Sequence, residues 1–438
     1  MPRALHCTLL MFAVLLAYAT AFQASFQFDD FNVIVDNPSV HSWEAWGESM
    51  PGIRPLLKLT YTLNWTSDWG ATGFHAVNIF IHGLNAVLVY MLALRWIRLF
   101  PGAAPSATSA LLAALLFALH PAQTEAVTYV SGRSVSLMAT FYLAAILVWL
   151  RDEGKWRSAV SPMLMLAALM VKETAWTLPF ALLLWQYAHG NPLRASMVSL
   201  RIHWLMLATA AIAMFAIPGY RHLLEGSLAA RDLGQNLLAQ VEGQFYLLSH
   251  SLLALQTNID PDIAVSLQPD FLWVLKLGML SGLVVWGLRE LRQRPWLGMG
   301  VLWFFLHLLP TNSLLPRADI ANDRQLYLAM IGPALVVAAS LCHYLGKPKA
   351  AFAGLVLVLL LGGTTLLRNQ DYRTEVSLWR ETASDSPHKA RVWNNLGYAY
   401  RLAGDTVQAR QAYQKALSLD PQDIQARANL MSLDRPSR

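Results

Sequence analysis

The residues of this 438-residue chain that first suggest chemistry are the adjacent carboxylates Asp29 and Asp30, which follow its first membrane-length apolar segment. Two charges at a membrane surface cost free energy unless a partner or a function uses them. Repulsion between neighbouring carboxylates raises the pKa of one member, which suits a general base. The alternatives are a cap for the following segment and a divalent cation, Mg²⁺ or Mn²⁺, held by both residues. The sequence does not separate the roles of the two carboxylates.

Several basic residues near the apolar segments suit an anionic ligand, because guanidinium groups bind phosphate through bidentate hydrogen bonds. Arg324 and Arg317 are the first choices for such a site, and Arg133, Arg54 and Lys172 are the second. Each one alone is equally explained as an interfacial side chain that reaches out of the membrane. The pattern therefore predicts a phosphate-binding wall whose members only the fold can bring together.

Composition indicates the kind of fold that must position these residues. The chain is 55% hydrophobic and only 14% charged, whereas soluble proteins carry about 25% charged residues. Apolar runs near membrane length recur, so we expect an all-α, polytopic membrane helical bundle. The net charge of +6 then reflects membrane topology rather than binding to nucleic acid. Cys7 and Cys342 fit packing roles better than a disulfide or a metal pair.

The apolar pattern predicts about eleven transmembrane helices, several of them short. They cover residues 4–22, 71–94, 107–121, 134–150, 158–171, 174–188, 200–217, 270–288, 296–310, 325–345 and 350–367. The first segment is expected to remain as a helix, the alternative being a cleaved signal peptide. The stretch 236–256 contains Glu242 and His250, so a surface or re-entrant helix is an alternative to a further span.

The connecting loops fall into two sets of different character. Short basic loops are expected to face the cytoplasm; they contain Arg95, Arg98, Arg151, Lys155, Arg157, Arg194, Arg289, Arg292, Arg294, Lys347 and Lys349. The opposite set includes a first outer loop at 23–70 and an outer segment at 218–269. It contains Asp29, Asp30, Arg54, Lys58, His120, Glu125, Arg133, Lys172, Glu173, Asp260, Asp262, Arg317, Asp319, Asp323 and Arg324. Acids and cations are thus expected to meet on the non-cytoplasmic face, where head-group binding and acid–base chemistry suit them.

The C-terminal region has the pattern of a soluble helical repeat. One complete tetratricopeptide repeat is expected at about 390–423, followed by a partial helix at about 424–433, within a repeat domain of 369–438. Its spacing is carried by Trp393, Leu396, Gly397, Tyr400, Gly404, Ala409, Tyr413, Ala416 and Pro421. One repeat cannot bury its own apolar faces, so it must pack on the membrane domain (1–368), another protomer or a partner. It serves either as a cap on the last membrane helix or as a docking surface for an acceptor.

Motifs that the chain lacks and motifs that it contains both limit the reactions it could catalyse. The chain has no Gly-x-x-x-x-Gly-Lys-Ser/Thr phosphate loop, no zinc-finger spacing and no Gly-x-Ser-x-Gly elbow. An ordered series of motifs is present instead: Phe28-Asp29-Asp30, Asp36-Asn37-Pro38, Arg54-Pro55-Leu56, Gly73-Phe74-His75, His120-Pro121, Thr124-Glu125, Gly132-Arg133-Ser134, Lys172-Glu173 and Asn322-Asp323-Arg324. With the repeat, this series resembles the transmembrane and tetratricopeptide-repeat O-mannosyltransferases and their bacterial relatives, within the GT-C glycosyltransferases. Those proteins usually carry many repeats, whereas this chain has about one.

The resemblance implies a sugar transfer from a polyprenyl-phosphate-linked donor to a hydroxyl of an exported protein, on the extracytoplasmic side. Asp29 or Asp30 would accept the proton of the acceptor hydroxyl, and the basic residues would bind the lipid phosphate. Sugar or acceptor contacts would come from Glu125, Glu173, His120 and Tyr327. The expected place is the cell inner membrane with a periplasmic repeat, or the endoplasmic reticulum membrane with a lumenal repeat in a eukaryote.

The sequence leaves three alternatives to this function open. Within the same chemistry, the acceptor is a glycan or a lipid. A transporter or lipid flippase predicts polar residues along the middle of several spans, whereas here the charges collect at one face. A non-enzymatic, repeat-bearing scaffold predicts that neutral replacements of Asp29 and Asp30 are tolerated.

Overall fold

The fold is entirely helical in the part of the chain that the computed structural model describes. That part comprises residues 3–99, 107–151, 154–253, 257–264, 268–317 and 319–433. Within it every regular element is a helix and no strand occurs, which confirms the all-α class. Parts of the predicted outer segment (254–256 and 265–267) and of the predicted repeat domain (434–438) lie outside the described residues.

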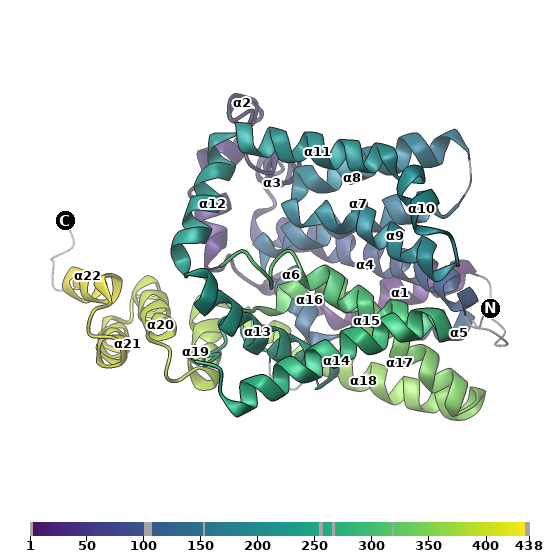
Figure 1. The fold of residues 1–438 in the computed structure, drawn as a ribbon. Coiled ribbons are helices and arrows are strands. Elements are labelled where there is room, and N and C mark those ends of the chain that lie inside the picture. Colours follow the sequence, from purple (N-terminus) through teal and green to yellow (C-terminus); the bar gives the residue numbers. More distant parts are fainter. Residues whose placement is uncertain are drawn as a thin grey trace.

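Each of the eleven predicted apolar segments contributes to a helix. The helices concerned are α1 Arg3–Ala17, α4 Gly70–Trp96, α5 Ala107–Ala118, α7 Arg133–Trp149, α8 Lys155–Val171, α9 Leu178–Ala188, α11 Arg201–Ala216, α14 Phe271–Gln293, α15 Pro295–Leu308, α17 Ile331–Tyr344 and α18 Lys347–Asp371. The helices lie side by side in a bundle (Figure 1). The helix α13 Leu233–Leu253 covers most of the ambiguous stretch 236–256.

Judged by the length and composition of its helices, the structure has fewer membrane spans than the eleven that the sequence predicts. Four helices in the described residues are long and apolar enough to cross a membrane, or up to seven if each bent pair is one span. The three bent pairs of helices have bends of 53°, 63° and 57° between their members. A count of eleven spans is therefore not confirmed, because several predicted segments form helices shorter than a membrane is thick.

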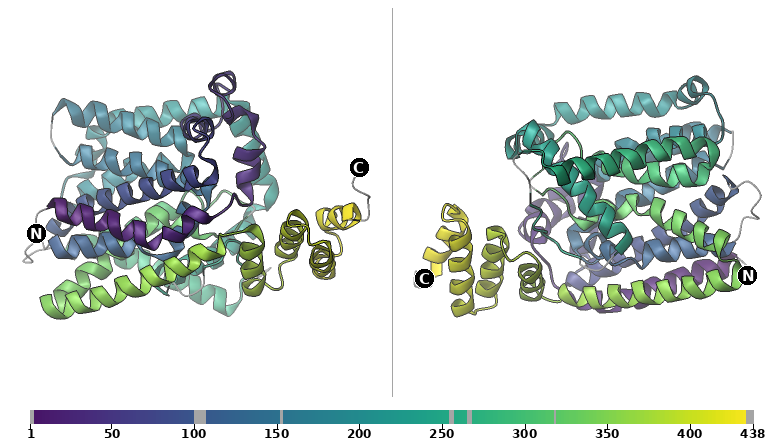
Figure 2. Two further views of the ribbon diagram at one scale, coloured as in Figure 1. Left: turned by 180° about the vertical axis from the view of Figure 1, so that it is seen from behind. Right: turned by 60° about the horizontal axis from the view of Figure 1, so that its bottom comes forward.

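The bundle has two distinct ends. The N-terminus and the short basic loops lie at one end, and the C-terminal helices project from the other, which we call the repeat end (Figures 1 and 2). The short helices of the predicted outer loop and segment also lie at the repeat end: η2 Phe31–Val35, η3 Pro38–Val40, α2 Trp43–Glu48, α3 Pro55–Thr66 and α12 Pro218–Ala230. Short elements that follow breaks in the bundle helices complete this end: η5 Pro121–Gln123, α6 Thr124–Val127, η6 Val130–Gly132, η7 Glu173–Thr177, η8 Asp323–Gln325 and α16 Leu326–Ala329. Further connections are η1 Ala19–Gln23, η4 Ile97–Leu99 and α10 Leu193–Ser199.

Close helix packing holds the bundle that carries these short elements. A Cβ atom on Gly332 of α17 would lie 2.2 Å from the carbonyl oxygen of Gly300 on α15. Small residues permit such an approach of two backbones, as is usual between membrane helices. Large buried side chains, including Trp96, Trp303 and Phe117, fill the rest of the core.

The C-terminal region forms four helices: α19 Glu375–Asp385, α20 Ala390–Leu402, α21 Thr406–Leu419 and α22 Ile424–Leu433. Helix α20 approaches α21 at Gly397, where a Cβ atom would lie 2.6 Å from the ring of Tyr413. Gly404 makes the turn between them with a φ of 81°, a conformation that glycine adopts without strain. Gly397 of α20 and Tyr413 of α21 therefore pack small against large within the repeat, and α22 matches the expected partial helix.

Candidate functional site

The carboxylates Asp29 and Asp30 occupy opposite environments at the repeat end. The side chain of Asp30 is fully buried, and its two oxygens accept hydrogen bonds from the backbone N–H groups of Gln27 at 2.9 Å and Ser131 at 2.7 Å, and from the Ser131 hydroxyl. The side chain of Asp29 is 40% exposed. Its backbone N–H donates to the hydroxyl of Tyr129 at 3.0 Å. Of these two residues, Asp29 is therefore the one whose carboxylate a substrate can reach.

The sequence predicts a raised pKa for one of the two carboxylates, and this residue is Asp30. Burial raises the pKa of Asp30 to about 7, the three hydrogen bonds from Ser131 and Gln27 oppose this rise, and the charge of Asp29 adds only the smallest contribution. The repulsion by Asp29 that the sequence predicts therefore contributes to the raised pKa of Asp30, and burial is the larger cause. Asp30 ties the first outer loop to η6, and this contact fixes the backbone from which Asp29 projects.

Arg324, on η8, is the cation nearest to Asp29, and several carboxylates surround it. Its guanidinium lies 3.4 Å from Glu125, 3.7 Å from Asp319 and 4.0 Å from Asp29. Glu125 also accepts the backbone N–H of Arg324 at 3.1 Å, so this carboxylate holds both the backbone and the side chain of the arginine. The structure thus brings Arg324, Asp29 and Glu125 together, and Asp319 joins them.

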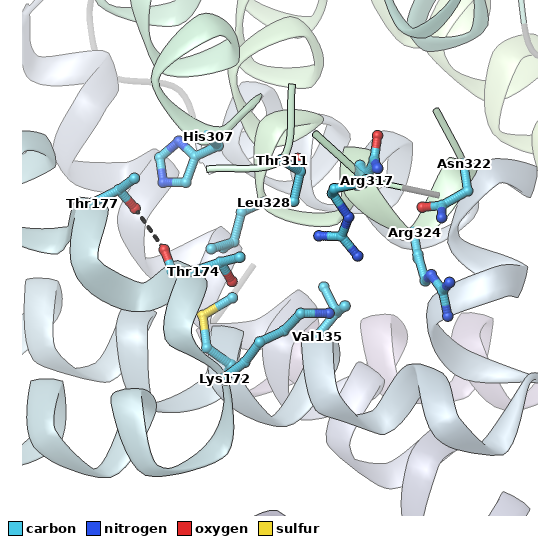
Figure 3. Close-up of a pocket in the computed structure, with 12 residues that line it drawn as sticks. Val135, Lys172, Thr174, Thr177, His307, Thr311, Arg317, Asn322, Arg324 and Leu328 are labelled. Carbon is cyan, nitrogen blue, oxygen red and sulfur yellow. Dashed lines mark hydrogen bonds between the residues drawn. The ribbon is translucent and has the colours of Figure 1, made fainter. Parts of the chain in front are cut away.

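A pocket that is partly open to the solvent lies beside Arg324. Its lining, which defines the cationic pocket, consists of Val135, Met138, Lys172, Thr174, Thr177, His307, Thr311, Arg317, Asn322, Arg324, Gln325 and Leu328. Lys172 and Arg317 direct their charged ends toward each other across this pocket (Figure 3). Three of the five predicted phosphate-binding cations therefore line one cavity.

Two of these cations lack a carboxylate partner in the described part of the chain. Lys172 is 8% exposed, and the one hydrogen bond of its ammonium within the described residues goes to the hydroxyl of Ser134 at 3.3 Å. No hydrogen bond or ion pair engages the Arg317 guanidinium within those residues. Burial and the neighbouring arginines lower the pKa values of both groups. Buried cations are normally paired, so this arrangement suits an anionic ligand.

The cationic pocket also contains amides that the sequence did not indicate as functional. Asn322 is 1% exposed, and neither polar atom of its side chain has a hydrogen-bond partner in the described structure. The amide of Gln325 lacks partners in the same way. Unpaired buried amides are rare in folded proteins, and here they line the same cavity as the unpaired cations. Their only signal in the sequence is the motif that they share with Arg324.

Arg54 and Arg133 form hydrogen bonds with other protein groups, outside the cationic pocket. Arg54 forms a bidentate ion pair with Glu173, with N–O distances of 3.0 and 2.5 Å. Burial opposes the ionisation of Glu173, but the charge and hydrogen bonds of Arg54 outweigh it and lower the pKa of Glu173 to about 2. Arg133 is fully buried and donates to Asn78 at 2.6 Å and to the carbonyl of Phe74 at 3.0 Å. Both arginines connect protein elements and do not line the cationic pocket.

His120 and Tyr327 are also placed in the helix packing. His120 is 5% exposed, and its ring accepts the backbone N–H of Ala122 at 3.3 Å. Tyr327 is fully buried, with its hydroxyl 2.7 Å from a ring nitrogen of His82 and 3.0 Å from the amide of Asn85. Neither side chain lines a described pocket.

A second, narrow pocket lies on the side of the C-terminal helices. We call it the interdomain pocket because its lining comes from both parts of the chain: Phe28, Glu125, Tyr129, Ile259, Asp260, Asp319, Arg324, Trp379 and Arg391. Arg324 lines both this pocket and the cationic pocket. The arginine therefore separates a cationic cavity from one with aromatic and mixed-charge walls.

The residues at the carboxylate pair do not fit the divalent cation considered from the sequence. Both oxygens of Asp30 accept hydrogen bonds from protein donors, which leaves Asp29 as a single available ligand. Across the described residues, no group of three or more His, Cys, Asp or Glu side chains is arranged to hold a metal ion.

Comparison with known proteins agrees with the C-terminal assignment. The family model of the tetratricopeptide repeat matches residues 390–423, the range predicted from the spacing of large and small residues. In the structure this range contains α20 and α21. A tetratricopeptide repeat at these residues is therefore confirmed.

Nearly the whole chain is similar to proteins named protein O-mannosyl-transferases. F38B6.6 of Caenorhabditis elegans is 26% identical over 438 residues, covering 93% of this chain and 61% of the relative. TMTC3 of Mus musculus is 26% identical over 489 residues, covering 97% and 52%. TMTC1 of Homo sapiens is 25% identical over 505 residues, covering 98% and 56%. The chain therefore spans 52% to 61% of the length of these relatives, none of which is bacterial.

Proposed function

We propose that the protein is an integral-membrane glycosyltransferase that moves one sugar from a polyprenyl-phosphate-linked donor to a Ser or Thr hydroxyl of a protein. Its similarity to proteins named O-mannosyl-transferases supports transfer to protein and makes mannose the first sugar to test. The donor class, the GT-C type and the extracytoplasmic side are parts of the proposal. The bacterial inner membrane with a periplasmic repeat end is the placement expected from the motifs, and a lumenal repeat end is its eukaryotic equivalent.

The observation that carries the proposal is a pair of cations in the cationic pocket, the buried Lys172 and the half-buried Arg317, that lack carboxylate partners in the described residues. A lipid phosphate remains anionic when the sugar leaves, so Lys172 and Arg317 would stabilise charge where it develops. Arg324 is already compensated by Glu125 and Asp319. Its role would be to connect the phosphate side of the site with Asp29. The unpaired amides of Asn322 and Gln325 would donate to the phosphate or the sugar.

The reaction is a single displacement at the anomeric carbon. The oxygen of the acceptor hydroxyl forms a bond to this carbon as the bond from the carbon to the phosphate oxygen breaks. Asp29 accepts the hydroxyl proton as the general base, and the lipid phosphate leaves as an anion held by Lys172 and Arg317. Asp30 does not touch the substrate in this scheme, because its carboxylate is buried against Gln27 and Ser131.

The two pockets suit the two substrates of such a displacement. An attacking group and a leaving group lie on opposite sides of the reacting carbon. The cationic pocket would take the phosphate, and the acceptor would approach from the interdomain pocket, whose aromatic walls are Phe28, Tyr129 and Trp379. The charged groups of the site collect at this end of the bundle rather than along the helices, which favours transfer over a transport path.

Glycan profiles of cells test this proposal. Cells that make the native protein are compared at equal expression with cells that make Asp29→Asn or Lys172→Met, and both glycoproteins and glycolipids are analysed. We expect one O-linked sugar to be lost from a defined protein in both variants. Loss of a glycolipid with unchanged glycoproteins would assign the acceptor to the lipid class. Unchanged profiles in both variants would refute glycosyl transfer by this site.

A further inference from the structure

The first C-terminal helix, α19, holds the loop that carries Asp29. The backbone N–H of Phe28 donates to the carboxylate of Glu375 at 2.9 Å, and the Phe28 ring meets the ring of Trp379 edge to face at 5.3 Å. The side chain of Gln27 donates to the carbonyl of Tyr372 at 2.9 Å, just before α19. All three contacts join residues more than 340 positions apart in the sequence.

The backbone conformation of Phe28 indicates that these contacts constrain the loop before Asp29. Its φ of 44° lies in the left-handed region, which a bulky side chain rarely adopts because of steric strain. Such a conformation persists only where the surroundings determine it. Glu375 and Trp379 supply those surroundings, immediately before Asp29.

The second C-terminal helix, α20, holds the loop that carries the arginines. Arg391 forms a bidentate ion pair with Asp260, including an Nε–O distance of 2.8 Å, and lies 2.6 Å from Asp319. Asp319 also lies 3.7 Å from Arg324. Lys389 reinforces Asp260 at 2.6 Å. A continuous series of charges therefore runs from α20 through Asp319 to Arg324.

We propose that α19 and α20 are part of the active site, with Glu375 positioning Asp29 and Arg391 positioning Arg324 and Arg317. The proposal rests on the proposed glycosyl transfer. It assigns the start of the C-terminal region a role in the chemistry that neither a cap nor a docking surface requires. Glu375 does not touch the substrate and acts through the loop that it holds. Arg391 lines the interdomain pocket and acts on the donor site through Asp319.

The two positioning residues have different kinetic consequences, because they hold different parts of the site. Loss of the Glu375 contact releases the backbone before Asp29, so the proton acceptor is displaced while the phosphate site is intact. Loss of the Arg391 contacts releases Asp319 and the arginine loop, so donor binding weakens. A displacement of about 1 Å reduces catalysis by about 100-fold.

The Glu375 arm of the test compares three variants of the full-length protein in liposomes. Glu375→Leu removes the acceptor of the Phe28 N–H and is expected to lower kcat by about 10- to 100-fold with little change in the KM for the donor. Glu375→Gln keeps an oxygen acceptor and is expected to retain activity. Glu381→Leu, on the exposed face of the same helix, is the matched control. Native kcat in a folded Glu375→Leu protein would overturn the role of Glu375.

The Arg391 arm uses the same assay. Arg391→Met is expected to raise the KM for the donor by about 10-fold or more. Arg401→Met, on the same helix and facing Tyr398 within the repeat, is expected to leave the KM unchanged. An unchanged KM in folded Arg391→Met protein would overturn the role of Arg391.

Hydrogen–deuterium exchange separates this proposal from the proposed function. In the native protein the amide of Phe28 should exchange slowly, because it donates to Glu375. We expect faster exchange at Phe28 in Glu375→Leu, but native exchange in Glu381→Leu. Unchanged exchange in Glu375→Leu would refute the hold on this loop, whether or not the protein transfers a sugar. Altered exchange without any transferase activity in the native protein would refute the proposed function alone.

Discussion

Replacing Lys172 by methionine should have opposite effects on stability and on ligand binding. Lys172 is 8% exposed, and in the described structure its ammonium makes one hydrogen bond, to the hydroxyl of Ser134 at 3.3 Å. Methionine has a similar length and no charge, so the substitution removes the cost of burying an unpaired cation. Exchanging buried ionic groups for apolar ones is neutral to stabilising by about 1–4 kcal/mol. We expect Lys172→Met to raise the free energy of unfolding of the ligand-free protein by about 1 kcal/mol.

The same substitution should weaken binding of a polyprenyl phosphate. One hydrogen bond to a charged group contributes about 1.5–3 kcal/mol, which corresponds to an increase of about 10- to 150-fold in Kd. Stability is measured by thermal unfolding in detergent, and Kd is measured by titration of the purified protein with the lipid phosphate. A residue that served the fold alone would lower stability and leave the Kd unchanged.

Arg54→Met is the matched control for this experiment. Arg54 forms two hydrogen bonds with Glu173, so its removal leaves a half-buried carboxylate unpaired. The side chains are 29% and 30% exposed, and solvent screening reduces the cost to about 1–3 kcal/mol. We expect Arg54→Met to lower stability with little direct effect on lipid phosphate binding. If Lys172→Met were destabilised like Arg54→Met and still bound the lipid normally, the anionic site would be refuted.

Further predictions concern pH and helix packing. Burial lowers the pKa of Lys172 and a bound phosphate needs the ammonium form, so the Kd should rise as the pH rises through this pKa; a similar rise in Lys172→Met would contradict this. The pKa of Glu173 is lowered from 4.5 to about 2, so the stability that its ion pair contributes is complete above pH 4.5 and lost as the pH falls toward 2; unfolding of native protein and Glu173→Gln should converge over this range. Gly332→Ala should destabilise the bundle by about 1–3 kcal/mol, because its Cβ would lie 2.2 Å from a carbonyl oxygen of Gly300; unchanged thermal unfolding would show that α15 and α17 can separate.

The repeat was predictable because its determinants are local. Gly397 and Tyr413 belong to one 34-residue spacing, and the turn at Gly404 needs the left-handed conformation that it adopts. The spans were less predictable, because hydropathy reports the length of an apolar run and not its bends. The break after Ala118, for example, precedes a 53° bend within one apolar stretch.

The site was predictable as a set of residue types and not as individual roles. Arg133 and Arg317 both precede or begin apolar segments, yet Arg133 meets Asn78 from 55 positions away and Arg317 stays unpaired in the described structure. Partners so distant along the chain leave no local signal. The same reason hid the difference between Asp29 and Asp30, which depends on Ser131, 101 residues further along the chain from Asp30.

The central claim is that Asp29 takes a proton from an acceptor hydroxyl beside a phosphate-binding pocket. Its most direct test is transfer of mannose from polyprenyl-phosphate-mannose to a Ser/Thr-containing polypeptide by protein purified into liposomes. We predict transfer by native protein and a loss of about 100-fold or more in kcat for Asp29→Asn, with an unchanged Kd for the lipid phosphate. Asp30→Asn should instead lower stability by about 1–3 kcal/mol, because a buried hydrogen bond is lost. Native kcat in folded Asp29→Asn protein would contradict the account.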